Sequence, residues 1–241
     1  KGYMLETRLG AMMRREGLPS IDALALRLRA PRAEALIAEM VEALTTNESS
    51  FFRDGKPFDH LKKLLPKLVA ARPAGQAIRI WSAACSSGQE AYSVAMLAAE
   101  LGAALAGRRV EILGTDLSQE MLQRARDGIF TQFEVQRGLP VQMLVKYFRQ
   151  DGTRWQVVPE LRAMVRWQAF NLLDDPRGLG RFDVVFCRNV LIYFDAPTKS
   201  RVLAALAGQV AADGVVYLGG AETVLGLTDR LVPAPGERGV Y

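Results

Sequence analysis

The sequence has one histidine, His60, and two cysteines, Cys85 and Cys187. Transition metals are usually held by His and Cys clusters at short spacings, so we expect no metal site of that kind. His60 lies beside lysines in a helical stretch, so we interpret it as a surface residue. A Ser-His-Asp catalytic site is therefore poorly supported. Two Cys in apolar, strand-like segments are typical of buried free thiols in a reducing compartment.

Long hydrophobic runs are also missing. No apolar stretch reaches the roughly 20 residues that a membrane-spanning helix needs, and the start, Lys1-Gly2-Tyr3, is not a secretory signal. We therefore expect a cytoplasmic protein without direct membrane insertion. Its net charge of +5 permits nucleic acid or an acidic protein as partner, but the basic residues are spread along the chain.

The first part of the chain carries only helical patterns. Leu5, Leu9 and Met12 fall on one helical face, and Pro31 suits the first turn of a later helix. We predict that residues 1–45 form an all-helical domain, because no strand pattern interrupts them.

The pattern changes near residue 77. Strands are predicted at 77–83, 110–115, 165–170, 182–187 and 214–219, with helices at 90–106, 118–127 and 198–212. Such alternation indicates βαβ units and a parallel, doubly wound sheet. Residues 77–241 are therefore predicted to be an α/β domain, and residues 46–76 a linker.

Two segments do not follow this alternation. Residues 146–160 alternate aromatic and polar positions around Asp151-Gly152, a dipeptide typical of hairpins, so they predict a small antiparallel insert. The tail, residues 231–241, is predicted to form a final hairpin with its turn at Pro235-Gly236.

The first predicted strand is followed by small residues. The loop 82–88 (SAACSSG) opens a helix, and its backbone, at Ala84 for example, can approach a ligand closely. Only Gly88 remains of the dinucleotide fingerprint G-x-G-x-x-G, so an NAD-dependent oxidoreductase is poorly supported. A nucleoside without a pyrophosphate, such as S-adenosylmethionine, suits this loop better. Asp116, which ends the second strand, is positioned to accept both ribose hydroxyls, whereas Ser118 competes with it for helix capping.

Further polar residues end the later strands. Asn171 can read an adenine edge while Leu172 packs on the ring, and an Asn-led turn is compatible with both roles. The pair Arg188-Asn189 interrupts a very apolar run, which indicates a site. Tyr193 either belongs to that site or is a core aromatic whose hydroxyl is bonded elsewhere.

Four motifs in one order resemble the CheR-type chemotaxis protein-glutamate methyltransferases. They are TTNESSFFRD (45–54), SAACSSGQEAYS (82–93), GTDLS with ARDGIF (114–118 and 125–130), and FDVVFCRNVLIYFD (182–195). The resemblance implies a signal-transduction enzyme that transfers a methyl group from S-adenosylmethionine to receptor glutamates, leaving S-adenosylhomocysteine. It also implies an N-terminal helical domain and a Rossmann-like methyltransferase sheet with a small antiparallel insert, the same parts that the residue pattern predicts.

The resemblance also assigns residues. The cofactor contacts fall on Asn47, Ser49, Arg53, Glu90, Asp116, Asn171, Leu172, Cys187 and Arg188, with Ala84 from the small-residue loop, and the catalytic pair is Arg53 and Tyr193. The predicted linker thus contains the first cofactor-contacting segment. Glutamate, with a pKa near 4.3, is ionised at neutral pH, so its attack on the methyl group needs no general base.

The sequence departs from the family pattern at two places. Residues 219–222 (GGAE) resemble a late GHSE motif without its His and Ser, and the turn at 151–153 is shorter than in relatives that dock on a receptor's C-terminal pentapeptide. From the short turn we expect no such tether. We also expect that the protein acts on the cytoplasmic helical domain of chemoreceptors and not on nucleic acid, and we take a monomer as the default.

Two other classes stay open. A nucleic-acid methyltransferase is favoured by the basic pI near 9.4, but Asn189–Tyr193 lacks the two prolines of an N-P-P-Y motif and no aromatic-basic stacking platform is evident. A non-catalytic signalling module would bind S-adenosylmethionine or a partner without methyl transfer, and the missing His keeps this alternative open.

Overall fold

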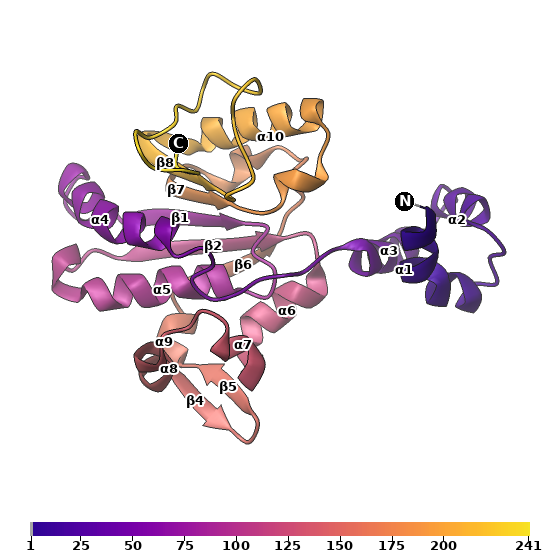
Figure 1. Cartoon of the computed structure of the whole chain (residues 1–241), viewed down its shortest axis with the longest axis horizontal. Coiled ribbons are helices and arrows are strands. Elements are labelled where there is room, and N and C mark those ends of the chain that lie inside the picture. Colours follow the sequence, from indigo (N-terminus) through magenta and orange to yellow (C-terminus); the bar gives the residue numbers. More distant parts are fainter. Residues whose placement is uncertain (1) are drawn as a thin grey trace.

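The computed structural model describes the backbone of residues 2–241 and the side chains from residue 5 onward. Lys1, where the predicted helical domain begins, lies outside the described residues. Helices α1 (Gly2–Arg15), α2 (Ile21–Leu28) and α3 (Glu34–Leu44) form a separate group that an extended chain joins to the α/β body (Figure 1). Their small core contains Leu9, Met12, Leu24 and Leu36. Pro31 lies in the turn before α3, so the prediction that it occupies the first turn of that helix was wrong.

The predicted linker contains a long helix, α4 (Lys56–Ala71). Phe58, Leu61 and Leu65 of this helix are almost fully buried in the main hydrophobic core. The linker is therefore shorter than we predicted, since α4 belongs to the α/β body. His60 on α4 is half-buried and shares a 2.8 Å hydrogen bond between Nδ1 and the Tyr217 hydroxyl, so its interpretation as a surface residue was wrong.

Five parallel strands form the main sheet in the order β6-β2-β1-β7-β8. They are β1 (Ile78–Ala83), β2 (Val110–Asp116), β6 (Val165–Ala169), β7 (Phe182–Cys187) and β8 (Val210–Leu218). The chain order reverses between β1 and β7, and in doubly wound sheets ligands bind at such a switch point, outside the carboxyl ends of the strands. The topology therefore identifies the edge of the sheet where a site is expected.

Helices cover both faces of this sheet. The core with α4 and α5 (Gln89–Leu101) contains Ile80 and Val184, whereas the core with α10 (Ala196–Gln209) contains Trp81 and Val185. Neighbouring residues of each strand thus point to opposite cores, as the two-residue period of a strand requires. Helix α5 ends at Leu101, earlier than we predicted, because Gly102 leaves the helical conformation with a φ of 42° and begins a short 3-10 helix, η1 (Gly102–Leu105).

The remaining short helices lie in the connections. They are α6 (Gln119–Asp127), α7 (Gln132–Gln136), α8 (Val141–Tyr147), α9 (Pro159–Arg162), and the 3-10 helices η2 (Pro176–Leu179) and η3 (Leu191–Tyr193). Among residues 2–241, no helix combines the length and the apolar character that crossing a membrane requires.

The antiparallel insert is a three-stranded sheet in the order β3-β5-β4. Strands β4 (Phe148–Asp151) and β5 (Arg154–Val157) form the predicted hairpin, with Asp151 opposite Arg154. Strand β3 (Ile129–Thr131) extends the insert to an earlier point in the chain, and a segment this short carries too little alternation to be predicted. The predicted fold class, a Rossmann-like sheet with a helical domain and a small insert, is confirmed.

The tail folds back onto the main sheet. The amide of Glu237 donates to the Ala234 carbonyl (3.1 Å), which confirms the turn at Pro235-Gly236. The predicted final hairpin was wrong, because residues 231–241 contain no strand and Val240 pairs with Tyr217 of β8. Beyond the turn, Val216 of β8 and Tyr241 exchange backbone hydrogen bonds of 2.8 and 3.0 Å. The last residues therefore cover the free edge of β8, which protects an edge that could otherwise pair with another chain.

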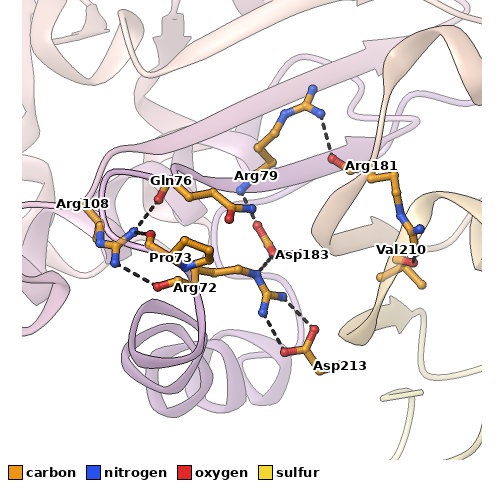
Figure 2. Close-up of polar contacts among 9 residues, drawn as sticks. All are labelled: Arg72, Pro73, Gln76, Arg79, Arg108, Arg181, Asp183, Val210 and Asp213. Atoms are coloured by element: carbon orange, nitrogen blue, oxygen red, sulfur yellow. Dashed lines mark hydrogen bonds and ion pairs between the residues drawn. The ribbon is translucent and has the colours of Figure 1, made fainter.

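Ion pairs fasten the opposite, amino end of the sheet to α4 (Figure 2). The Nε of Arg72 donates to Asp183 (2.6 Å), and its two terminal nitrogens donate to the two oxygens of Asp213 (2.7 and 2.8 Å). The second oxygen of Asp183 accepts a hydrogen bond from the Arg79 amide (2.8 Å). Arg108 donates to backbone carbonyls, including that of Gln76 (3.0 Å). The charged groups at this end thus find their partners within the protein.

Candidate active site

A cavity of about 440 Å³ opens at the carboxyl edge of the sheet. Its walls come from α3, from the extended segment 45–50, and from the loops after β1, β2, β6 and β7. Among the lining residues are Asn47, Ser49, Arg53, Ala84, Glu90, Asp116, Asn171, Leu172, Arg188 and Tyr193. Except for Cys187, every predicted cofactor-contact and catalytic residue therefore lies around one hollow.

Cys187 is the exception. Its side chain is fully buried in the core with α10, and burial raises the pKa of its thiol well above the usual range. The prediction of a ligand contact from this residue can therefore apply to its backbone but not to its thiol.

The loop after β1 has an unusual backbone. Ala84 and Ser86 adopt left-handed φ values of 57° and 51°, which cost a non-glycine residue roughly 1 kcal/mol or more each. Gly88 has a φ of 93°, and a Cβ there would come within 2.8 Å of the Trp167 ring and 3.0 Å of Ala125. The loop therefore needs glycine at position 88, and it keeps its strained residues where they face the cavity.

Asp116 lies at the floor of the cavity and is only 6% exposed. Its carboxylate accepts hydrogen bonds from the backbone amides of Ser86 (2.7 Å) and Ser118 (2.9 Å). A carboxylate has about four acceptor sites, so capacity for hydroxyl donors remains. Ser118 itself caps α6 by accepting from the Met121 amide (3.0 Å), which settles the competition for that role.

The environment of Asp116 also disfavours its charged form. Burial raises the pKa of Asp116, and the nearby negative charge of Glu42 acts in the same direction, while the backbone amides of Ser118, Ser86 and Leu117 oppose the shift. A ligand that donates hydroxyl hydrogens to the carboxylate would favour the ionised form.

Arg188 holds the segment around Arg53 in place. Its guanidinium, with a side chain only 2% exposed, donates to Glu90 (3.1 Å), to Asp54 (2.6 Å) and to the backbone carbonyl of Arg53 (2.7 Å). Glu90 in turn accepts from the Ser82 hydroxyl (2.7 Å). Breaking these contacts would leave the buried charge of Arg188 uncompensated, which is energetically costly. The network therefore holds the backbone that carries Arg53.

The predicted catalytic pair lies at the rim of the cavity. The guanidinium of Arg53 donates to the Glu48 carbonyl (2.9 Å), which uses one of its five N–H groups. The Tyr193 ring, at the end of η3, is 60% exposed, so the alternative of a core aromatic is wrong. Asn171 accepts from the Leu173 amide (3.0 Å) and thus makes the Asn-led turn, while its amide nitrogen remains available as a donor.

Glu222 does not line the cavity, but it supports the turn after β7, a role that the sequence did not reveal. Its buried carboxylate accepts hydrogen bonds from the amides of Asn189 (2.9 Å), Val190 (2.9 Å), Leu191 (2.8 Å) and Gly219 (2.6 Å). One side chain therefore fixes the turn that ends in Tyr193. The signal was available in the late motif, where Glu222 is retained although the His and Ser are missing.

Three buried side-chain atoms of cavity-lining residues, the Ser86 Oγ, the Asn189 Oδ1 and the Arg188 Nε, have no hydrogen-bond partner within the described part of the chain. An unpaired buried polar atom costs about 1–3 kcal/mol, and most such atoms in folded proteins are paired. Apolar side chains such as Phe170 and Leu172 line the same cavity. Polar atoms that need partners, a carboxylate and an apolar wall together suit a nucleoside with a charged tail.

Comparison with known proteins gives the family. The profile described as "CheR methyltransferase, SAM binding domain" matches residues 47–240, which is most of the chain. The chain belongs to the CheR methyltransferase family. It is therefore an enzyme that uses S-adenosylmethionine, the ligand that the cavity fits.

Curated members of this family are similar over almost the full sequence. The chemotaxis protein methyltransferase Cher2 of Pseudomonas putida is 41% identical, with 95% of this chain and 85% of that protein covered. The chemotaxis protein methyltransferase 1 of Pseudomonas aeruginosa is 43% identical with the same shares. The chemotaxis protein methyltransferase of Vibrio parahaemolyticus is 38% identical, covering 95% and 84%.

Proposed function

We propose that this methyltransferase esterifies glutamate side chains of chemoreceptors in the cytoplasm, giving glutamate methyl esters and S-adenosylhomocysteine. The observation that carries the proposal is the convergence of the four family motifs on one cavity, with Asp116 at its floor and Arg53 and Tyr193 at its rim. The receptor as acceptor is also supported by the family and by the names of the relatives.

The walls of the cavity suggest how the cofactor is held. We assign the ribose hydroxyls to Asp116, the adenine to Asn171 and Leu172, and further polar contacts to Asn47, Ser49 and the backbone around Ala84. Glu90 and Arg188, which are hydrogen-bonded to each other, would contact the cofactor together. A contact from position 187 would use the backbone.

When bound, S-adenosylmethionine supplies a methyl group on a positively charged sulfur. The acceptor carboxylate is already ionised, so the protein has to orient it and to remove part of its water. Arg53 at the rim can align the carboxylate through charge-assisted hydrogen bonds. Tyr193 can donate its hydroxyl to the attacking carboxylate or pack beside the methyl group. The new carbon–oxygen bond forms as the carbon–sulfur bond breaks, and no proton has to move.

We propose the cytoplasmic helical domain of the receptor as the substrate surface. Only Gly152 and Thr153 connect the paired residues of the insert hairpin, so this turn offers little surface for a receptor's C-terminal pentapeptide. We therefore propose that the enzyme acts without that tether. As separate parts of the proposal, it acts as a monomer, without nucleic acid and without membrane insertion. Micromolar binding of a receptor tail peptide would contradict the tether proposal.

A methyl-transfer assay tests the function. The protein is incubated with radiolabelled S-adenosylmethionine and either receptor fragments or nucleic acid, and glutamate methyl esters are detected as methanol released by alkali. We expect label in the receptor fraction only. Label in nucleic acid, or cofactor binding without transfer to any receptor fragment, would favour one of the alternative classes.

The same assay tests Arg53. Arg53→Ala should lower turnover about 100-fold, since it removes a charge-assisted contact to the reacting carboxylate, while the free energy of unfolding changes by less than about 0.5 kcal/mol. Arg137→Ala is the matched control, because the exposed Arg137 side chain contacts Glu48 and the Phe133 ring and does not line the cavity. A variant of Arg53 that simply unfolds would indicate a structural role.

A further inference from the structure

We propose that Glu42 is a positioning residue that latches the helical domain over the cofactor cavity and slows release of the spent cofactor. This inference rests on the proposed use of the cavity for S-adenosylmethionine. We define the Glu42 latch as the carboxylate of Glu42 on α3 together with its two hydrogen-bond donors at the start of α6.

The latch joins segments that are far apart in the sequence. One oxygen of the half-buried Glu42 accepts a short hydrogen bond from the hydroxyl of Ser118, which is fully buried, and the other accepts from the backbone amide of Glu120 (3.2 Å). Glu42 belongs to the helical domain, whereas Ser118 and Glu120 belong to the α/β body. One carboxylate thus makes two hydrogen bonds between the two parts.

The position at the start of α6 suits a carboxylate. The first amides of a helix have no acceptor within the helix, and its amino end carries a partial positive charge. Ser118 accepts from the Met121 amide, which lies in the first turn, and Glu42 accepts from the Glu120 amide in the same turn. The cap of α6 is therefore completed by a residue from the other domain, and the Glu120 amide loses this acceptor if the domains separate, whereas the cap by Ser118 remains.

The latch adjoins the cavity on both sides. Val41 and Leu44, which flank Glu42 on α3, line the cavity wall. Ser118 also donates its backbone amide to Asp116 at the cavity floor (2.9 Å). Separation of Glu42 from Ser118 would move one wall away and free the side chain of a residue that supports Asp116. The latch therefore joins a wall of the cavity to the residue whose backbone amide supports the carboxylate assigned to the ribose.

The chain between the domains makes such a contact necessary. Residues 45–50 have no helix or strand, and Asn47 and Ser49 within them line the cavity. An extended segment does not fix the position of a domain by itself, so contacts such as the Glu42 latch decide how far the helical domain covers the cavity. Opening of the latch is then a step that precedes exchange of the cofactor.

The test measures release of S-adenosylhomocysteine from the full 241-residue chain by stopped-flow displacement with excess S-adenosylmethionine. Glu42→Ala should release the product about tenfold faster, as expected for the loss of charge-assisted hydrogen bonds at a half-buried site. Glu42→Gln, which keeps the size and one acceptor oxygen, should give a smaller increase. In steady-state assays KM for S-adenosylmethionine should rise by a larger factor than kcat changes, whereas loss of folded protein would lower kcat.

Glu39→Gln is the matched control. Glu39 lies on the same helix and pairs with Arg15 inside the helical domain, so this variant should release the product at the wild-type rate. Thermal unfolding of each variant confirms that folded protein is compared. Wild-type release kinetics in both Glu42 variants would overturn the latch alone. If the wild-type protein does not bind S-adenosylhomocysteine, both the latch and the proposed function are overturned.

Discussion

The two ends of the parallel sheet differ in how their polar groups are paired. At the amino end, Arg72 is bonded to Asp183 and Asp213, and Asp183 also accepts from the Arg79 amide (Figure 2). At the carboxyl end, the Ser86 hydroxyl and the Asn189 carbonyl oxygen are buried without a partner in the described structure.

The backbone differs in degree, since Ala106 in the turn before β2 has a left-handed φ of 49° and several residues do so at the carboxyl end. Ala84, Ser86 and Asn189 at the carboxyl end have left-handed φ values, although none of them is glycine. Such conformations cost energy and persist only where the surroundings impose them, commonly at functional sites. One sheet thus has an end whose interactions serve stability and an end whose geometry serves a ligand, and variants at the two ends should fail in different assays.

The largest effect is expected at the amino end. Asp183→Ala should lower the free energy of unfolding by about 3 kcal/mol, because it leaves the buried Arg72 guanidinium without its inner partner. Chemical denaturation measures this, and calorimetry with S-adenosylhomocysteine should show wild-type affinity in the folded protein. Asp213→Ala is the control, since Asp213 is 55% exposed and should cost less than about 1 kcal/mol. Equal losses in both variants would contradict the contrast.

The next effect is expected at the carboxyl end. Asp116→Ala should weaken S-adenosylmethionine binding about 100-fold, because two hydrogen bonds from hydroxyls to a charged group are lost. Ser86 and Ser118 donate to different oxygens of Asp116, so Asp116→Asn keeps an acceptor for one of the two backbone amides and should weaken binding less than the alanine variant does. Calorimetry measures both affinities. Unchanged affinity in the alanine variant would refute the ribose assignment.

A smaller effect is expected for Glu222→Gln. The amide keeps the shape of the side chain but presents a donor to backbone N–H groups that now share a carboxylate, so the turn before Tyr193 should loosen. Turnover should fall about tenfold, the consequence of one misplaced catalytic group, with a smaller change in cofactor affinity. Glu237→Gln in the exposed tail turn is the control. Normal turnover in a folded Glu222 variant would show that the turn holds Tyr193 without this carboxylate.

The smallest effect concerns pH. Because burial and Glu42 raise the pKa of Asp116, cofactor affinity should begin to fall at a higher pH than it would for an ordinary aspartate. The contribution of Asp116 to stability has the opposite sign: a folded-state pKa above the unfolded value makes folding more favourable as pH falls. Carboxylates with a lowered pKa, such as those of Glu39 and Asp213, lose stability as pH falls, so the contribution of Asp116 is measured as the difference in unfolding free energy between the wild type and Asp116→Asn over one pH series. This difference should shift in favour of the wild type as pH falls while affinity declines, and Glu42→Gln should move the loss of affinity to lower pH. A difference that stays constant with pH would contradict this assignment.

Much of the fold could be predicted because strands and helices alternate clearly after residue 77. The hairpin at Asp151-Gly152 and the turn at Pro235-Gly236 carry local signals that act whatever the surroundings. Helix α4 was placed in a linker because its membership of the core depends on long-range contacts of residues such as Phe58 and Leu61 with the sheet. His60 was misread for the same reason, since its partner Tyr217 lies far along the chain.

The site was predicted where chemistry follows from position at the end of a strand. Asp116 and Asn171 each follow a predicted strand, and parallel strands bring their carboxyl ends to one edge. The part that escaped prediction consists of supporting residues. Glu222 and Glu42 act through backbone amides and a hydroxyl on other elements, so their roles depend on tertiary geometry that no local pattern encodes. Cys187 was predicted by motif position, which cannot distinguish a backbone contact from a side-chain contact.

The segment 45–50 serves at once as tether and as cavity wall. An extended chain gains at most about 3.3–3.6 Å per residue, so its length limits how far the helical domain can move before Asn47 and Ser49 are pulled from the cavity. Displacement of the helical domain would thus be transmitted directly to the cofactor site. Inserting one residue would lengthen this segment, so the helical domain could move farther before Asn47 and Ser49 leave the cavity.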